Sequence, residues 1–280
     1  MLLNNNLHIA VLLTCYNRKD KTLQCLQSFY KSINKLPELN FEIFLVDDGS
    51  SDGTTEAVQG FFPEICIIQG TGELYWNRGM HLAWETASKK KDFDYYLWLN
   101  DDVELYDHAI SDLFEIAFKY DGIAVGVMQE SPKGQTTYGG LNENGELINP
   151  NGTIQPCRVF NGNLVLVPNV IFEKVGMLDS FYWHSMGDLD YAFRSLKKGF
   201  KHYIPGKYSG ICKKNTSLPK WCLSGYSIKE KLKSLYSPLG NSHPYYYFIY
   251  EYRHYGLGVA IKHFITIHLR VLMPKLWNQK

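Results

Sequence analysis

The sequence predicts an α/β protein built on a doubly wound, mostly parallel sheet. Short apolar runs alternate with amphipathic segments over the first half of the 280 residues, and this alternation is typical of strand–helix–strand units. Polar and acidic residues follow directly after several of the apolar runs. Ligands of such sheets bind beyond the carboxyl ends of the strands, so these residues are expected to meet in one crevice.

The chain begins with two strand–helix units. The apolar run Leu7–Thr14 ends in polar residues and predicts a buried strand, while Lys19–Asn34 carries its apolar residues at helical spacing. Phe41–Val46 predicts the second strand, and Gly53–Gly60 a short helix. Ile65–Gln69 predicts the third strand.

The pattern continues to the middle of the chain. Trp76–Lys91 predicts a helix with one apolar side, and Tyr95–Leu99 a fourth strand. Asp107–Lys119 predicts a helix, Gly122–Met128 a fifth strand and Leu164–Val167 another apolar strand.

The remaining segments differ in character. Tyr138–Pro156 is rich in glycine, asparagine and proline and predicts a hairpin or loop insert over the crevice. Asp188–Gly199 predicts a helix that glycine closes, and Gly206–Pro244 is basic and predicts loops. Tyr245–Lys280 is aromatic and then amphipathic.

The amphipathic part of the tail has two interpretations. On a helical wheel one face combines His268 with five apolar residues, which are Leu257, Ile261, Phe264, Val271 and Leu272. Lys262 and Arg270 fall opposite. A basic amphipathic helix lies in a membrane interface or packs on its own domain, and the sequence leaves both interpretations open.

Composition excludes several classes of protein. The net charge of +1 lacks the basic field of a nucleic-acid-binding protein. The six cysteines form no CxxC pair, so neither a zinc site nor a disulfide framework is expected. The N-terminus lacks the pattern of a secretion signal, and no run of about 18 uncharged apolar residues occurs. A cytoplasmic location follows as an expectation.

The acids after the strands suggest chemistry on a nucleotide diphosphate. Asp101-Asp102 follows a strand, and a hard divalent cation takes one or two carboxylates together with phosphate oxygens. Asp48 can accept a hydrogen bond from a base N–H. Asp188 begins a helix and can act as a general base. Each position also suits ordinary turn, capping or helix-dipole chemistry.

Four motifs together resemble the family 2 inverting glycosyltransferases of the GT-A fold. Thr14-Cys15-Tyr16-Asn17-Arg18 is similar to the family's opening turn, and Val46-Asp47-Asp48-Gly49-Ser50-Ser51-Asp52 to its second motif. Asn100-Asp101-Asp102 stands where the family has its DxD-type metal motif. The segment from Gly187 to Arg194 resembles the base-bearing helix start. The resemblance covers roughly Ile9 to His202.

The resemblance implies a role for each matching residue. Thr14, Tyr16, Arg18, Asp48 and Asp101 would bind the nucleotide, with Asp48 on the base imide and Asp101 on the ribose. Asp102 would hold Mg²⁺ or Mn²⁺, Arg78 would contact phosphate and Asp188 would be the general base.

Two positions depart from the family pattern. Gly187 replaces the usual glutamate before the base, so any orienting role passes to another group or is absent. The stretch Ser209-Gly210-Ile211-Cys212 lacks the histidine that ligates metal in many members. His184 is a substitute ligand or, as the favoured interpretation, a structural imidazole.

The predicted protein is therefore a metal-dependent, inverting glycosyltransferase. It would move a sugar from a UDP- or dTDP-sugar to a hydroxyl of a glycan or lipid-linked acceptor. Rhamnosyl- or galactosyl-type transfer in bacterial capsule or O-antigen synthesis is expected. Residues 1–205 would form the GT-A domain, with a nucleotide-sugar half to about 128 and an acceptor half at 129–205, and 206–280 a helical extension.

Two alternative functions and one possible membrane contact accompany this prediction. A sugar nucleotidyltransferase uses a similar sheet but usually has a glycine-rich, basic loop after the first strand, which Thr14–Arg18 lacks. A non-catalytic module that binds nucleotide-sugars is the other alternative. Residues 245–280 would make any peripheral contact with the inner face of the cytoplasmic membrane.

Overall fold

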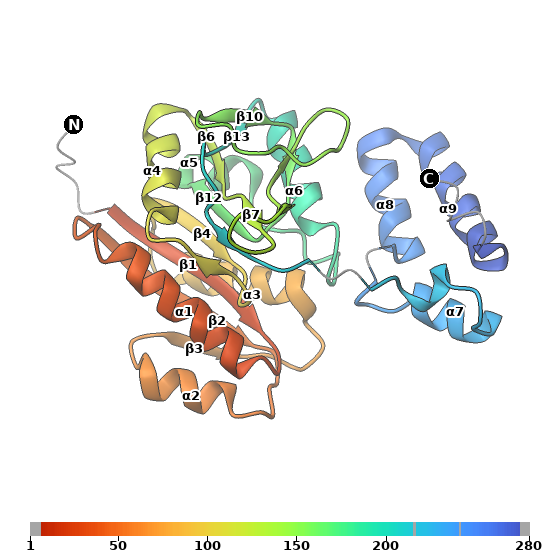
Figure 1. Cartoon of the computed structure of the whole chain (residues 1–280), viewed down its shortest axis with the longest axis horizontal. Coiled ribbons are helices and arrows are strands. Elements are labelled where there is room, and N and C mark those ends of the chain that lie inside the picture. The colour runs from red at the N-terminus through yellow and green to blue at the C-terminus, as the bar shows by residue number, and fades with distance from the viewer. Residues whose placement is uncertain (1–6, 215–216, 241, 275–280) are drawn as a thin grey trace.

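The protein, described here by a computed structural model, is built around one eight-stranded sheet (Figure 1). The structure describes residues 7–214, 217–240 and 242–274. The order of the strands across the sheet is β10-β13-β6-β12-β4-β1-β2-β3. Their bounds are β1 Leu7–Cys15, β2 Leu39–Asp47, β3 Cys66–Gln69, β4 Tyr95–Leu99, β6 Gly122–Val125, β10 Gln155–Cys157, β12 Leu164–Pro168 and β13 Lys201–Ile204.

Most pairs of neighbouring strands are parallel. β1 pairs in parallel with β2 and β4, β2 with β3, and β6 with β13. β12 runs antiparallel to both β4 and β6, and β10 antiparallel to β13. The predicted α/β fold class with a mostly parallel, doubly wound sheet is confirmed.

Helices cover both faces of the sheet (Figure 1). On one face lie α1 (Lys19–Ile33), α2 (Thr54–Phe61) and α4 (Ala109–Lys119), and on the other lie α3 (Tyr75–Lys90), α5 (Asn169–Val175) and α6 (Gly187–Lys197). Alternate residues of β1 point to the two layers, with Val11 and Leu13 toward α1 and Ala10 and Leu12 toward α3. A strand buried on both faces must be apolar throughout, which explains the continuous apolar run of β1.

The predicted strand Gly122–Met128 is wrong as a single element. The structure has β6, then a break, then β7 (Met128–Gln129) in a second sheet of order β5-β14-β7-β8. At the break the Gly126 amide donates to the Leu164 carbonyl at 2.9 Å, and a Cβ on Gly126 would lie 2.6 Å from the Leu164 side chain. Glycine therefore allows the chain to cross between the sheets.

The region predicted as a hairpin or loop insert is mostly loop. It contains β9 (Gly140–Leu141) and the ends of β8 (Thr136–Tyr138) and β10, and the short strands around it form two smaller sheets. The second sheet contains β5 (Glu104–Leu105), β8 and β14 (Gly210–Ile211) besides β7, and β9 pairs with β11 (Val159–Phe160). β14 follows residue 205 in the chain but pairs with β5 and β7. The first residues of the predicted extension thus pack with the body of the protein.

The C-terminal part of the chain is helical. It comprises the 3₁₀ turn η1 (Lys220–Cys222), α7 (Ile228–Leu235), α8 (Pro244–Tyr255) and α9 (Leu257–Leu272). These helices lie together at one end of the molecule, beyond α6 (Figure 1). The basic segment predicted as loops contains α7, which begins with a capping box formed by Ser227 and Glu230. Gly256, at φ +93°, separates α8 from α9.

The predicted face of the tail helix is only partly covered. Val271 is buried with Ile267, Trp221 and Leu235 in a small core, whereas Leu257, Ile261, Phe264 and Leu272 are exposed. Positions 275–280 of the predicted tail lie outside the described residues. Among the helices of the described ranges, none combines the length and the apolarity that crossing a membrane requires.

Candidate active site

The polar turns after β1, β2 and β4 meet at one edge of the sheet. Arg18 follows β1, and its Nη1 donates to Asp101 Oδ1 at 3.1 Å and to Asp102 Oδ2 at 2.9 Å. Asn17 links the turn after β1 to the turn after β2, because its Oδ1 accepts from the Ser51 amide at 2.7 Å. The convergence expected from the sequence is therefore present.

Asp101 and Asp102 lie in different environments. Asp101 is only 5% exposed, and its Oδ2 has no hydrogen-bond partner among the described residues. Burial raises the pKa of Asp101 to about 7, against the opposing effect of the Arg18 guanidinium. Asp102 is more exposed, and its Oδ1 accepts a weak hydrogen bond from the Cys212 thiol at 3.6 Å. Cys212 thus lies beside the predicted metal ligand.

Asp48 fixes the segment between β3 and α3 through hydrogen bonds to its backbone. Its carboxylate accepts from the backbone amides of Gly72 at 2.8 Å, Leu74 at 2.9 Å and Tyr75 at 3.0 Å. The side chain is buried, so it fixes the segment that leads from β3 into α3. A bond to the base imide would need a remaining lone pair and stays a prediction.

Thr14 and Tyr16 flank the end of β1 in different ways. Thr14 is buried under α3, where a Cβ on Gly79 would lie 2.3 Å from its Oγ1. The absence of a side chain at Gly79 lets α3 approach the strand end closely. Tyr16 is 55% exposed, which leaves its ring accessible.

Asp188 lies at the same edge of the sheet as Asp101. Because β12 is antiparallel, its first residue, Leu164, stands opposite Leu99 at the end of β4. Just before β12, the Gly162 amide donates to Asp188 Oδ2 at 3.0 Å, and the Asn163 carbonyl accepts from the Asn100 amide at 2.9 Å. Burial raises the pKa of Asp188, which suits a group that accepts a proton near neutral pH.

Two tryptophans to which sequence reasoning assigned no role of their own line this edge, although Trp76 lies in the segment from Gly72 to Met80, which resembles the family region that lines the nucleotide-sugar. Trp76 Nε1 donates to Asn100 Oδ1 at 2.7 Å, and its ring lies against Gly162. Trp183 stacks on Tyr75 with ring centroids 5.7 Å apart. Their neighbours in sequence, Arg78 and His184, were singled out, but nothing in the pattern distinguished these rings from core tryptophans.

Arg78 engages the segment before α6. Its Nε donates to the Ser180 carbonyl at 2.9 Å, and its guanidinium carbon lies 4.3 Å from the centroid of the Trp183 ring. The described structure thus gives Arg78 a role in fixing the segment that contains Trp183. Its contact with phosphate stays a prediction.

His184 is close enough to Arg18 to respond to its charge. Burial, and then the Arg18 guanidinium, lower the pKa of His184, so the imidazole is neutral near pH 7. Its Nδ1 is buried without a hydrogen-bond partner in the part of the chain that the structure describes. Whether His184 ligates metal stays a prediction.

The residues fit a cation that is shared with substrate. Within the described ranges, no three His, Cys, Asp or Glu side chains form a cluster that could hold a metal ion. Mg²⁺ is commonly held by one or two carboxylates together with phosphate oxygens, and needs no complete protein cage. Asp102 is partly exposed and lies beside Asp101, whose Oδ2 has no hydrogen-bond partner among the described residues, so this pair suits that arrangement.

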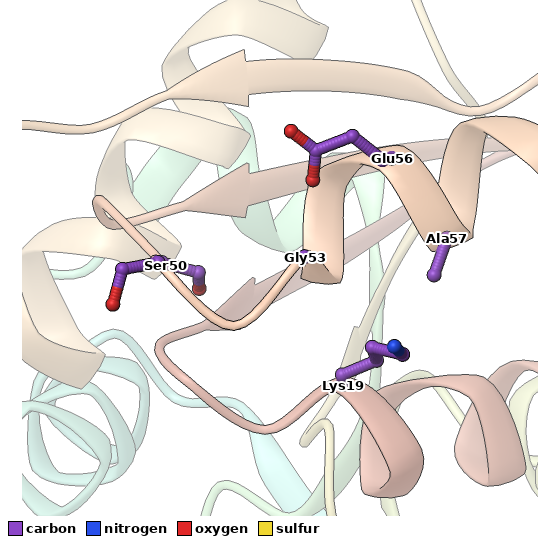
Figure 2. Close-up of a pocket in the computed structure, with 6 residues that line it drawn as sticks. Lys19, Ser50, Gly53, Glu56 and Ala57 are labelled. Carbon is purple, nitrogen blue, oxygen red and sulfur yellow. The ribbon is translucent and has the colours of Figure 1, made fainter.

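A separate open pocket lies beside this edge. It has a volume of about 530 Å³ and is lined by Lys19, Ser50, Ser51, Gly53, Glu56 and Ala57. Figure 2 shows Lys19 at the start of α1 and Glu56 on α2 on opposite sides of it. Asp101, Asp102 and Asp188 do not line this pocket. We therefore place the candidate active site at the sheet edge where these three carboxylates lie, and not in this pocket.

The mostly parallel sheet, with helices on both faces, is that of a GT-A-fold glycosyltransferase. The chain belongs to the family described as Glycosyl transferase family 2, whose model matches residues 10–177. The match includes Asp48, Asp101 and Asp102 but ends before Asp188.

Two solved structures share the fold. The mannosyltransferase PcManGT from Pyrobaculum calidifontis, in complex with GDP-Man and Mn²⁺, is 16% identical with a TM-score of 0.53, over 92% of this chain and 73% of that one. S. aureus TarS 1-349, in complex with UDP, is 11% identical with a TM-score of 0.56, over 94% and 71%. No curated protein matches the sequence significantly.

Proposed function

We propose that this glycosyltransferase moves a sugar from a UDP- or dTDP-sugar to a hydroxyl of a glycan or lipid-linked acceptor, with inversion and with a divalent metal. The observation that carries the proposal is the placement of Asp101 and Asp102 at the end of β4, linked through Asn100, Asn163 and Gly162 to Asp188. Two acids for the donor and one for the acceptor thus share one edge of the sheet.

The donor would lie across the ends of β1, β2 and β4. Thr14, Tyr16 and Asp48 would border the base, and Asp101 would face the ribose with its buried Oδ2, which has no hydrogen-bond partner within the described ranges. Arg18 and Arg78 supply positive charge for the phosphates. Support comes from the related folds, since one was solved with GDP-Man and Mn²⁺ and the other with UDP.

Asp102 would hold Mg²⁺ or Mn²⁺ together with the diphosphate. When bound, the cation neutralises charge on the leaving nucleoside diphosphate. The guanidinium of Arg18 already lies 2.9 Å from Asp102 Oδ2, so the chain itself provides a second positive charge at this position. This charge would remain beside the phosphates as the bond to the sugar breaks.

Asp188 would remove the proton from the acceptor hydroxyl. Its carboxylate is oriented by the amides of Gly162 and Leu189, at 3.0 and 2.8 Å. The acceptor oxygen then attacks the anomeric carbon from the side opposite the nucleotide, which inverts the configuration. The raised pKa of Asp188 strengthens it as a base for a weakly acidic hydroxyl.

The biological setting belongs to the same proposal. We place the enzyme in bacterial surface-polysaccharide synthesis, such as capsule or O-antigen, with rhamnosyl- or galactosyl-type transfer at the cytoplasmic side of the membrane. Residues 1–205 would be the GT-A domain and 206–280 an extension toward the acceptor or membrane. The inverting outcome and the setting rest on the family resemblance.

A panel of nucleotide-sugars tests the proposal. Release of nucleoside diphosphate is measured with Mn²⁺ or Mg²⁺ for the wild type, Asp102→Ala and the control Asp107→Ala, whose exposed carboxylate pairs with Lys31. We expect metal-dependent release from one donor, lost only in Asp102→Ala. Release of pyrophosphate would identify a nucleotidyltransferase instead. Binding of nucleotide without turnover, unaffected by Asp188→Asn, would identify a binding module.

A further inference from the structure

Charge is distributed unevenly between the two parts of the chain. Residues 206–280 contain 12 Lys and Arg but only two Asp and Glu, a net charge of +10. Residues 1–205 contain 17 Lys and Arg and 26 Asp and Glu, a net charge of −9. The overall charge of +1 conceals this separation, and such asymmetry indicates that the basic part meets an acidic surface.

The same basic part exposes most of the large apolar side chains. Of the 21 large hydrophobic residues that are exposed in the described ranges, 17 lie between Leu218 and Met273. The other four, Tyr16, Phe61, Phe118 and Val170, are scattered over the rest of the protein. Scattered apolar residues are normal on a surface, but a concentration of this size marks an interaction site.

Helix α9 supplies the centre of this surface. Leu257, Ile261, Ile265 and Leu269 recur every four residues and are each 44–53% exposed, and Leu272 falls among them on the wheel. At 100° per residue these five positions occupy an arc of about 120°. The helix buries the neighbouring arc, with Ala260, Ile267 and Val271. The rest of the protein therefore covers the arc of α9 that contains Ala260, Ile267 and Val271, and leaves the neighbouring apolar arc exposed to solvent.

Helix α7 extends the surface. Ile228, Leu232 and Tyr236 are exposed along α7 and at its end. The hydroxyl of Tyr236 lies 2.8 Å from Nε2 of His268, on the exposed side of α9. The two helices thus form one continuous surface, which we call the apolar face: Ile228, Leu232, Tyr236, Leu257, Ile261, Ile265, Leu269 and Leu272.

Lysines belong to the same elements. Lys229 and Lys233 are exposed on α7, Lys262 is exposed on α9, and Lys213, Lys214 and Lys220 are exposed in the segment before α7. None of these six forms a salt bridge with a carboxylate in the described part of the chain. Unneutralised ammonium groups beside exposed apolar side chains are complementary to anionic lipid headgroups over acyl chains.

We propose that the apolar face lies in the interface of a bilayer that contains anionic lipids, with α9 parallel to the membrane plane. No described helix can span the bilayer, so the contact is peripheral. The proposal deepens the proposed function, and rests on it only in explaining how the enzyme meets a lipid-linked acceptor. Helix α8 connects the apolar face to the candidate site, because His254 Nε2 on α8 lies 2.9 Å from Asp190 Oδ1 on α6, the helix that also carries Asp188.

Sedimentation with vesicles tests the proposal on the full chain. We expect binding to phosphatidylcholine vesicles with about one third phosphatidylglycerol, much weaker binding to phosphatidylcholine alone, and release as salt is raised to about 0.5 M. The double variant Ile261→Glu/Ile265→Glu should abolish binding. Lys229→Gln/Lys233→Gln should weaken it, by about fivefold for each lysine. Phe61→Glu, at an exposed position of α2, should bind as the wild type does.

Two controls keep the outcomes distinct. Thermal unfolding and nucleoside diphosphate release in solution should match the wild type in Ile261→Glu/Ile265→Glu, because neither residue lies near the candidate active site. If the wild type releases nucleoside diphosphate but does not bind vesicles, membrane docking is wrong and the proposed function stands. If it binds vesicles but releases no nucleoside diphosphate, docking stands and the proposed function is wrong. Absence of vesicle binding with a concentration-dependent dimer that Ile261→Glu/Ile265→Glu abolishes would assign the face to a second copy of the chain.

Discussion

The side-chain oxygen of Asn77 occupies the place where Gly187 would carry a Cβ, with a separation of only 1.7 Å from that position. Asn77 is fully buried in α3, and its Nδ2 donates to the carbonyls of Asp179 and Tyr182, each at 2.7 Å. Gly187 is the first residue of α6 and precedes Asp188. The glycine that departs from the family pattern is therefore required by the packing of α3 against the start of the base-bearing helix.

Gly187→Ala should displace the start of α6. The added Cβ forces Asn77 or the helix to move, and such overpacking typically costs about 1–3 kcal/mol of unfolding free energy. We expect a matching loss of nucleoside diphosphate release, because Asp188 moves with the helix. Chemical unfolding and turnover of Gly187→Ala measure both effects. Gly60→Ala is the control, since a Cβ in that helix meets nothing within 4 Å. If Gly187→Ala unfolds and turns over like the wild type, the Asn77 side chain can move away from the added Cβ at little cost in stability.

The pH dependence of transfer should report on Asp188. A base acts when deprotonated, so kcat/KM should rise with pH through the pKa of Asp188, which burial places above the ordinary value of an aspartate. Asp188→Asn should remove this rise and lower the rate by about 10²–10⁴-fold. An acid limb at the ordinary aspartate value would assign the base to another group, whereas a limb near pH 7 that persists in Asp188→Asn would report Asp101, whose pKa burial raises to about 7.

Metal binding should depend on Asp102 and on nucleotide together. Because the described residues offer no protein-only metal cluster, Mn²⁺ alone should change thermal stability little. With a nucleoside diphosphate at about 100 times its dissociation constant, Mn²⁺ should stabilise the wild type by about 2.7 kcal/mol. A chelator or Asp102→Ala should remove most of this gain. An equal gain in the chelated protein would show that nucleotide binds without metal, with Arg18 as the main counter-charge.

The apolar runs were sufficient to predict six of the eight strands of the main sheet, because β1, β2 and β4 are buried on both faces, whereas β10 and β13 were missed. For the same reason, the positions of Asp48, Asp101 and Asp102 at one sheet edge followed from strand ends alone. The short strands β7, β9, β11 and β14 were not predictable, since each has two residues and forms only through partners distant in sequence. Two residues are too few to show the alternation of apolar and polar side chains that indicates a strand.

Other features depend on contacts that no local pattern contains. The three backbone amides that donate to Asp48 come from the segment between β3 and the start of α3. Because these contacts are distant in sequence, the sequence alone could not show how many acceptor positions of the carboxylate remain for a ligand. The close approach of Asn77 to Gly187 joins residues more than 100 positions apart. Helix α7, by contrast, had a local signal that was missed, the capping-box pair Ser227 and Glu230.

His202 should make the stability of the protein fall at mildly acidic pH. The imidazole is fully buried in β13, with Nδ1 2.8 Å from the Arg158 carbonyl and Nε2 2.6 Å from the Ser195 hydroxyl. Burial lowers the pKa of His202 to about 4, from an ordinary value of 6.5. Between these values the unfolded chain binds a proton that the folded protein does not.

The free energy of unfolding should therefore be unaffected by this group above pH 6.5 and decrease as the pH falls toward 4. The shift corresponds to a loss of about 3 kcal/mol over that range. His202→Gln keeps a polar side chain that does not titrate, so it should be less stable than the wild type at pH 7 and lose less stability on acidification. Urea unfolding of both proteins between pH 7 and pH 4 measures the difference. A constant difference over this range would show that His202 is protonated equally in the folded and unfolded states.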